Sequence, residues 1–360
     1  MLYLLLEPLK EHFSFLNVFR YITFRASYAA VTSLVLCFIL GPPLIRWLKK
    51  IGIRDNLRPY LEHIHRSKKG TPTMGGIIML MSITISIFLW ADLGNRYILI
   101  VLFSLLWLGG IGIIDDILKV RRKTGLSART KLLGQFVIGL TLGLILTFKP
   151  QVAGYENMTS VLFLKNVFLN MGIFYTPFII FVIIGTSNAV NITDGLDGLA
   201  TGLIVVTAIG YGILCYITGN VNISEYLNIL FVHGSGELTI PCVSIAGAAL
   251  GFLWFNSYPA QVFMGDTGSL ALGGILAITA ILIKQEILLM LLGGFFLIEA
   301  LSVILQVLYF KITKGKRLFR MAPIHHHFEK LGWPEQKIVV RFWIIAILLA
   351  LIGLSTLKIR

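Results

Sequence analysis

Five aspartates stand at the ends of apolar runs or in the short connections between them, in a chain that has few acidic residues. Asp and Glu make up only 17 of the 360 residues, and the neighbours of these five include Gly, Asn, Ser and Thr. Such residues suit tight turns whose backbone N–H groups can face phosphate oxygens. Carboxylates bind Mg²⁺, which commonly takes a substrate phosphate as a further ligand. Each aspartate alone could instead cap a helix or anchor it at a membrane surface, but the set favours a magnesium–phosphate site. The five are Asp115, Asp116, Asp194, Asp197 and Asp266.

A histidine tract and a lysine-containing stretch could supply further phosphate contacts. The tract could bind a metal or be a polar surface run, but adjacent side chains on a helix point about 100° apart, which disfavours a three-histidine zinc site. One or two of the imidazoles are expected to hydrogen-bond phosphate. Lys68 and Thr73 precede an apolar run, and a helix N-terminus of small and hydroxyl residues favours anion binding, although it could equally be an ordinary capped start. The tract is His325, His326 and His327.

The apolar segments that must position these residues are long enough to cross a membrane. The chain is 56% hydrophobic and 13% charged, against about 25% charged in an ordinary soluble domain. A bilayer core needs about 20 apolar residues as a helix, and somewhat fewer with flanking help. Ten such segments predict an all-α integral membrane protein with a single domain over 1–360: 26–45, 74–91, 97–114, 132–148, 172–190, 199–218, 238–255, 267–283, 287–310 and 338–357.

The positive charges predict the orientation. Most of the 31 Lys and Arg residues fall in three loops that lie on the same side of a ten-span chain. Such loops stay cytoplasmic, so we expect all five aspartates at the cytoplasmic face, both termini in the periplasm and residues 1–20 as an interfacial segment. The net charge of +14 attracts anionic lipid and could also draw an anionic substrate. No nucleic-acid motif is present, so no such partner is expected. The expected cytoplasmic loops are 46–73, 115–131, 190–198, 256–267 and 311–337.

Two polar residues interrupt the ninth apolar segment. Glu299 and Gln306 are seven residues apart and therefore share a helix face. We expect them to form interhelical hydrogen bonds, and Gln306 could also face substrate. The sequence contains no GxxxxGK[ST], HExxH or GxSxG pattern, which disfavours ATP hydrolysis and serine hydrolase chemistry.

Together these motifs resemble the polyprenyl-phosphate N-acetylhexosamine-1-phosphate transferase superfamily, most closely its peptidoglycan branch, the phospho-N-acetylmuramoyl-pentapeptide transferases. The resemblance covers essentially the whole chain, and the histidine motif is the most specific for that branch. It implies that UDP-N-acetylmuramoyl-pentapeptide and undecaprenyl phosphate give lipid I and UMP, with Mg²⁺ as cofactor. It also implies a homodimer in the bacterial inner membrane. The motifs are Lys68–Gly76, Asp115–Asp116, Asn188–Gly198, Phe263–Ser269 and Ala322–Glu329.

The resemblance also implies roles for single residues. Asp266 is expected to bind Mg²⁺, with Asp115 and Asp116 as further candidate ligands. Asp115 would deprotonate or orient the lipid phosphate, His325 would contact the diphosphate, and Phe263 would stack on uracil. The expected catalytic residues are Asp115, Asp116, Asp266 and His325, and the expected substrate-binding residues are Lys68, Thr73, Lys131, Asn188, Asn191, Asp194, Asp197, Phe263, Gln306 and His326.

Three other functions compete with this interpretation. A transporter could use membrane carboxylates, but these cluster at one face and no inverted repeat is visible. A sister enzyme could use UDP-N-acetylglucosamine. A CDP-alcohol phosphotransferase shares the pattern around Asp194 and Asp197, but Thr201 replaces its arginine and the downstream aspartate pair is missing. The sequence leaves open whether transfer is direct or passes through a covalent phospho-enzyme.

Overall fold

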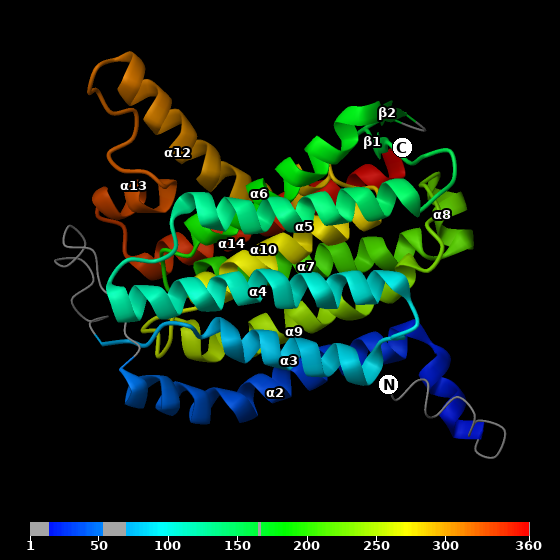
Figure 1. Cartoon of the computed structure of the whole chain (residues 1–360), viewed down its shortest axis with the longest axis horizontal. Coiled ribbons are helices and arrows are strands. Elements are labelled where there is room, and N and C mark those ends of the chain that lie inside the picture. Colours follow the sequence, from blue (N-terminus) through cyan, green and yellow to red (C-terminus); the bar gives the residue numbers. More distant parts are fainter. Residues whose placement is uncertain (1–13, 53–69, 165–166, 360) are drawn as a thin grey trace.

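Apolar helices make up most of the computed structural model, which describes residues 14–52, 70–164 and 167–359 (Figure 1). Within these residues, nine helices are long and apolar enough to cross a membrane, and α3 is a shorter apolar helix of 15 residues. The predicted all-α membrane fold is therefore confirmed, although the second predicted span is too short to meet the length standard. The ten helices are α2 (Ile22–Ile51), α3 (Gly76–Trp90), α4 (Arg96–Arg122), α5 (Ala128–Phe148), α6 (Tyr175–Thr193), α7 (Leu199–Thr218), α9 (Thr239–Asn256), α10 (Gly265–Leu282), α12 (Gly294–Ile312) and α14 (Glu335–Ile359).

Shorter elements connect these helices. Two antiparallel strands, β1 and β2, interrupt the helical fold between α5 and α6, with Thr159 opposite Leu169. The sequence did not predict them. Figure 1 shows the strands at the end of the molecule where α14 ends. The connecting elements are η2 (Ser14–Arg20), β1 (Met158–Ser160), β2 (Phe168–Asn170), η5 (Gly172–Phe174), α8 (Val221–Leu227), η6 (Ser235–Leu238), α11 (Leu289–Leu292) and α13 (Ile324–Lys330).

Several helices extend beyond the apolar segments that predicted them. Helix α4 continues to Arg122, so Asp115 and Asp116 lie inside a helix and the connection to α5 is much shorter than the predicted loop 115–131. The hydroxyl of Ser127 accepts a hydrogen bond from the backbone N–H of Thr130 and caps the start of α5. Hydropathy locates only the apolar part of a helix, whereas backbone hydrogen bonding continues past it into the charged turns.

The other predicted loops also contain helical residues. Helix α2 runs to Ile51, helix α10 begins at Gly265, and α13 lies within the predicted loop 311–337. Of the predicted interfacial segment 1–20, residues 1–13 lie outside the described residues and the remainder forms η2.

Helix α10 is the centre of the bundle. All its residues from Asp266 to Leu282 are buried, and it packs against α4, α6, α3 and α7. Small residues permit this close packing. A Cβ on Gly273 would overlap Val190 of α6, for example. Because α10 is fixed on several sides, the residues at its two ends are held in defined positions.

Helix α12 is the least embedded of the long helices. Figure 1 shows it leaning away from the rest of the bundle. Only 22% of its most apolar stretch is buried, against 94% in α10. Exposed apolar residues such as Ile304, Leu305 and Leu308 therefore offer a broad surface to lipid.

Candidate active site

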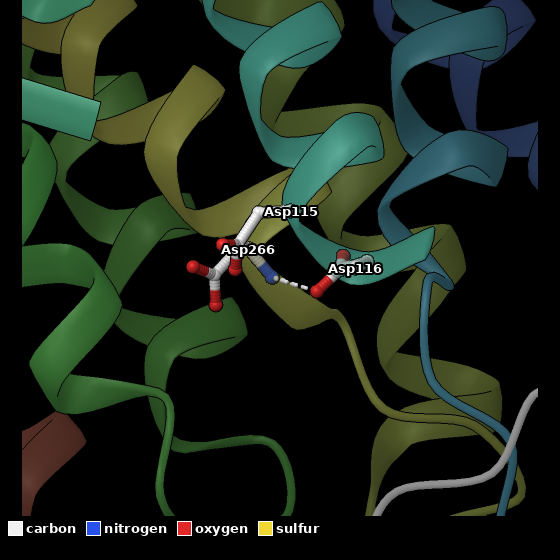
Figure 2. A group of neighbouring side chains, drawn as sticks. All are labelled: Asp115, Asp116 and Asp266. Carbon is white, nitrogen blue, oxygen red and sulfur yellow. Dashed lines mark hydrogen bonds between the residues drawn. The ribbon is translucent and has the colours of Figure 1, made fainter. Parts of the chain in front are cut away.

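The two adjacent aspartates of α4 and the aspartate in the first turn of α10 come together (Figure 2). Each of Asp115, Asp116 and Asp266 offers a carboxylate oxygen, and these three oxygens lie within 4.8 Å of one another. All three side chains are buried. The sequence predicted that these residues would share one face of the membrane, and the structure brings them into one group.

Two glycines allow this approach. A Cβ on Gly112 of α4 would overlap the backbone of Asp266 and Thr267, so the two helices could not come as close with any other residue there. Gly265 has φ +72°, a left-handed conformation that other residues rarely adopt, and it turns the chain into α10 beside Asp116. The glycines around the aspartates thus determine the packing of α4 on α10.

Asp116 caps α10 from outside that helix. Its Oδ2 accepts hydrogen bonds from the backbone N–H of Thr267 (2.9 Å) and the Thr267 hydroxyl (2.7 Å). Its Oδ1 accepts from the backbone N–H of Asp266 (3.2 Å). Negative charge at a helix N-terminus is stabilising because the first N–H groups have no partner within the helix. The Asp116 carboxylate therefore fixes the backbone that carries Asp266.

Two lysines bridge the other two aspartates. Nζ of Lys119 lies 2.7 Å from Oδ2 of Asp115 and 2.7 Å from Oδ1 of Asp266. Nζ of Lys131 lies 2.8 Å from Oδ2 of Asp115 and 2.6 Å from Oδ2 of Asp266. We call Asp115, Asp116, Asp266, Lys119 and Lys131 the aspartate–lysine cluster. The two lysines are partly accessible, whereas the carboxylates are buried beneath them.

Lys119 is the functional candidate that the sequence interpretation missed. In the sequence, Lys119 was one of many basic residues that predict the membrane orientation, and nothing marked it as a site residue. It follows Asp115 by four residues, a spacing that places both side chains on one helix face, but only if the helix continues past the apolar run.

The cluster has the donor chemistry of a Mg²⁺ site. Its ligand atoms are hard carboxylate oxygens, which Mg²⁺ prefers. Three carboxylates face two ammonium groups, so one negative charge within the cluster has no opposite charge. Asp115 and Asp266 each contact both ammonium groups at 2.8 Å or less, whereas Asp116 accepts three hydrogen bonds from the start of α10 and lies 3.7 Å from Lys119 Nζ. Asp115 and Asp266 are therefore the carboxylates best suited to hold a divalent cation.

Several predicted substrate-binding residues surround the start of α10. The backbone N–H of Phe263 donates to Pro72 O (2.9 Å), and the N–H of Gly75 donates to Phe263 O (2.8 Å), which fixes the stretch before α3 against the stretch before α10. The Thr73 hydroxyl lies beside Gly265. The side chain of Asn191 donates to Ser269 Oγ (2.8 Å). Lys68 lies outside the described residues.

Two other predicted residues make contacts outside the cluster. The side chain of Asn188 donates to Gln135 Oε1 and to Ile184 O, each at 2.8 Å. Asp197 is buried, and its Oδ2 accepts from the backbone N–H of Ala260 (3.0 Å) in the connection between α9 and α10. These contacts join α5 to α6 and the α6–α7 connection to the α9–α10 connection. Asp194, half-buried, stands at the end of α6.

The histidines of α13 have separate partners. Nδ1 of His325 lies 3.1 Å from Glu299 Oε2, and Nδ1 of His326 lies 2.6 Å from Glu329 Oε2. Nδ1 of His327 accepts from the backbone N–H of Arg320. Burial lowers the pKa of His326, an effect that the Glu329 hydrogen bond opposes. Within the described part of the chain, the three imidazoles therefore do not converge on a common point.

Gln306 lies at a cavity between α12 and the stretch that leads to α13. Its Oε1 accepts from the backbone N–H of Phe319 (2.8 Å), and the cavity has a volume of about 670 Å³. Apolar side chains of α12 form one wall, and three cations lie around it. The lining residues are Val303, Gln306, Val307, Phe310, Lys311, Arg317, Met321, Ala322 and Lys330.

The chain is similar to known proteins over its full length. A family model described as glycosyl transferase family 4 matches residues 97–284. The phospho-N-acetylmuramoyl-pentapeptide-transferase of Thermodesulfovibrio yellowstonii is 52% identical over 362 residues, with 100% of both chains covered. The proteins of the same name from Desulforapulum autotrophicum and Desulfosudis oleivorans are each 53% identical, also with 100% of both chains covered.

Proposed function

The chain belongs to the phospho-N-acetylmuramoyl-pentapeptide transferase family, and we propose that its aspartate–lysine cluster is the site of that transfer. The enzyme moves phospho-N-acetylmuramoyl-pentapeptide from UDP-N-acetylmuramoyl-pentapeptide to undecaprenyl phosphate. The products are lipid I and UMP, and the reaction is the first membrane step of peptidoglycan synthesis. One observation carries the assignment of the site: two partly accessible lysines share the buried carboxylates of Asp115 and Asp266.

The reaction needs positioning and charge neutralisation more than covalent chemistry from the protein. A phosphate oxygen of the lipid bonds to the β-phosphorus of the donor, and the bond from that phosphorus to the α–β bridging oxygen breaks. Its electron pair leaves with UMP. Lys119 and Lys131 are cations that can turn from the carboxylates toward phosphate oxygens, because their ammonium groups lie at the accessible side of the cluster. Asp115 orients both lysines and faces the incoming lipid phosphate.

Mg²⁺ completes this site in our proposal. Asp266 and Asp115 would hold the ion, and Asp116 would support Asp266 through the start of α10. Bound there, the ion would neutralise charge on the phosphates. Helices α4 and α10 hold the carboxylates of Asp115 and Asp266 in place and away from bulk water. The two lysines and the ion could then share these carboxylates.

The residues around the start of α10 form the donor side of the proposed site. Phe263, half-buried next to Gly265, would stack on uracil, and Asn191 and Asp194 would contact the nucleotide. Thr73 and, from the resemblance alone, Lys68 would contact the diphosphate. His325, His326 and Gln306 would bind donor groups from the side of α12 and α13. Asn188 supports this side by joining α6 to α5, and Asp197 supports it by joining the α6–α7 connection to the α9–α10 connection.

We propose that this end of the bundle faces the cytoplasm of a bacterial inner membrane. The ends of α2, α4 and α12 carry basic residues in their last turns, and basic ends stay cytoplasmic. In Figure 1 the start of α2 and the end of α14 both lie at the opposite end of the bundle, which would place the two termini in the periplasm. The nucleotide donor is soluble and the acceptor is a lipid, so the two meet only at that surface. We also propose that the enzyme acts as a homodimer.

A transfer assay tests the proposed function. Purified full-length protein is given fluorescent UDP-N-acetylmuramoyl-pentapeptide and undecaprenyl phosphate, with Mg²⁺ or with EDTA, and lipid I and UMP are measured. We expect both products with Mg²⁺ only, and no product when UDP-N-acetylglucosamine replaces the donor. Release of UMP without acceptor lipid would favour a covalent intermediate, and lipid I formed equally well in EDTA would contradict the magnesium proposal.

A further inference from the structure

A carboxylate is buried in a helix that otherwise faces lipid. Glu299 of α12 is 0% exposed, although most of that helix is exposed and apolar. Placing an acidic side chain at membrane depth is energetically costly, and such residues commonly mark functional sites. Oε2 of Glu299 lies 3.1 Å from Nδ1 of His325, within hydrogen-bond distance, and Oε1 of Glu299 has no partner within the described residues. A simple interhelical contact would not require a charged group here, so another role is indicated.

The partner of this carboxylate is held at one nitrogen only. His325 is 1% exposed, and its Nε2 has no hydrogen-bond partner among the residues that the structure describes. That atom lies against Gly195, at a place where a Cβ on residue 195 would collide with it. Gly195 belongs to the connection between α6 and α7, next to Asp194. The imidazole therefore points its unpaired nitrogen at the proposed donor side.

We infer that Glu299 is a positioning residue that acts through His325 on the nucleotide donor. The inference rests on the proposed function. A carboxylate accepts hydrogen bonds, so Nδ1–H of His325 donates to Glu299 and the ring is fixed with Nε2 toward residue 195. Nε2 can then form a hydrogen bond with a polar group of the donor. Because residue 195 has no side chain, Nε2 can occupy the space that a Cβ would fill. A buried polar atom without a partner calls for such a ligand.

Other ionisable groups lie close to this pair. The His326 ring is 4.2 Å from the His325 ring, centroid to centroid, and it is itself bonded to Glu329. Asp194 adjoins Gly195 in sequence. Since Glu329 is bonded to His326, Glu299 is the carboxylate positioned to orient His325.

Steady-state kinetics on full-length variants test the inference. We expect Glu299→Leu to lower kcat/KM for the donor by roughly 10- to 100-fold, the range found when a group that orients a functional histidine is removed. Glu299→Gln keeps an acceptor for Nδ1–H and should lose clearly less. The KM for undecaprenyl phosphate should not change. Ser302→Ala, which removes a buried hydroxyl one turn along α12, is the matched control and should behave as wild type.

A double-mutant cycle separates positioning from a purely structural role. If Glu299 acts through His325, Glu299→Leu adds no further loss to His325→Ala. Losses that simply add, or a fall in thermal stability with unchanged KM for both substrates, would overturn the inference.

A spectroscopic readout keeps the inference separate from the proposed function. In ¹⁵N-histidine-labelled protein, with the His325 signal assigned by its loss in His325→Ala, wild type should show a protonated Nδ1. Glu299→Leu should change that signal and Ser302→Ala should not. An unchanged signal in Glu299→Leu would overturn the inference whether or not the protein transfers the donor. Absence of transfer by wild type would instead contradict only the proposed function.

Discussion

Helix α10 has a buried ionic group at each end, and the two groups differ in how their charges are matched. At its start, the aspartate–lysine cluster sets three carboxylates against two ammonium groups. Beyond its end at Leu282, Lys284 and Glu286 form the second group with Tyr175 and Thr159, which we call the Lys284 cluster. Here Nζ of Lys284 donates to Glu156 O (2.8 Å) and to Tyr175 OH (2.9 Å). Glu286 accepts from Tyr175 OH (2.5 Å) and Thr159 Oγ1 (2.6 Å).

Access separates the two clusters further. The side chains of Lys119 and Lys131 are 43% and 20% exposed, whereas Lys284 is 1% exposed. Lysines at the accessible cluster can exchange a carboxylate for a phosphate, but Lys284 has no solvent route to a new partner. Burial of charged groups alone therefore does not identify a reactive site. In our proposal, unequal charge together with accessible cations marks the transfer site, whereas the closed Lys284 cluster ties β1 and α6 to the turn after α10.

The largest expected loss of activity follows from a substitution in the aspartate–lysine cluster. Asp266→Asn keeps the size of the side chain and removes its charge, so we expect transfer to fall by roughly 10³-fold, the scale of losing a major electrostatic contact in an active site. UMP release measures the change. Asp92→Asn, which alters a carboxylate in the α3–α4 connection bonded to the N–H of Gly94, should keep normal turnover. Near-normal turnover in Asp266→Asn would contradict the proposal that the aspartate–lysine cluster is reactive and the Lys284 cluster structural.

Removing one ammonium group from the same cluster should have a smaller effect. We expect Lys119→Met and Lys131→Met each to reduce kcat by about 10²-fold, because one cation that can contact phosphate is lost while the other remains. Lys123→Met changes an exposed lysine just after α4 and serves as the control. If Lys123→Met lowered kcat as much as Lys119→Met, the effect would come from general surface charge.

The Lys284 cluster should respond in stability and not in chemistry. Lys284→Met removes the hydrogen bonds that Nζ donates to Glu156 O and Tyr175 OH, and a buried polar group left without its partner costs about 1–3 kcal/mol. We expect the thermal unfolding midpoint to fall clearly, whereas kcat per folded molecule at low temperature stays within about twofold. Lys149→Met, an exposed lysine at the same end of the bundle, should change neither quantity. A loss of kcat at an unchanged midpoint would assign a catalytic role to this end.

The smallest expected effect is a pH dependence of that stability. Burial lowers the pKa of Lys284 to about 8, and burial raises the pKa of Glu286. Between about pH 8 and the ordinary lysine value near 10.4, the unfolded chain holds a proton that the folded chain has released. Stability therefore rises with pH in this window. Relative to Lys284→Met/Glu286→Gln, wild type should gain a few degrees in midpoint between pH 7.5 and 9.5. If the unfolding midpoints of wild type and the double variant changed in parallel with pH, Lys284 would not titrate between pH 7.5 and 9.5.

The sequence predicted the helices and the aspartates of the aspartate–lysine cluster, but it did not predict the Lys284 cluster. Apolar length locates the helices, and Asp115, Asp116 and Asp266 stand out because acidic residues are rare in this chain. Lys119 escaped notice because its pairing depends on α4 continuing past the apolar run. The Lys284 cluster escaped because its members come from three distant stretches, and nothing in their local sequence shows that they meet.

Two details of the site could be found only in three dimensions. The oxygens of Asp116 cap a helix that begins 149 residues after it, at Gly265, through hydrogen bonds to the N–H groups of Asp266 and Thr267. Glu299 was predicted to bond another helix, and the structure identifies His325 as the partner. Such contacts depend on how close two helices approach, which small residues such as Gly112 decide through packing that a single sequence does not display.

Metal binding is the most direct test of the central claim, that unequal charge makes the aspartate–lysine cluster the cation–phosphate site. Mn²⁺, which stands in for Mg²⁺, is titrated into full-length wild type, Asp266→Asn and Asp92→Asn, and free Mn²⁺ is measured by electron paramagnetic resonance. We predict one saturable site in wild type and Asp92→Asn, and at least tenfold weaker binding in Asp266→Asn. Equal Mn²⁺ affinity in all three proteins would contradict the proposal that the aspartate–lysine cluster binds the cation.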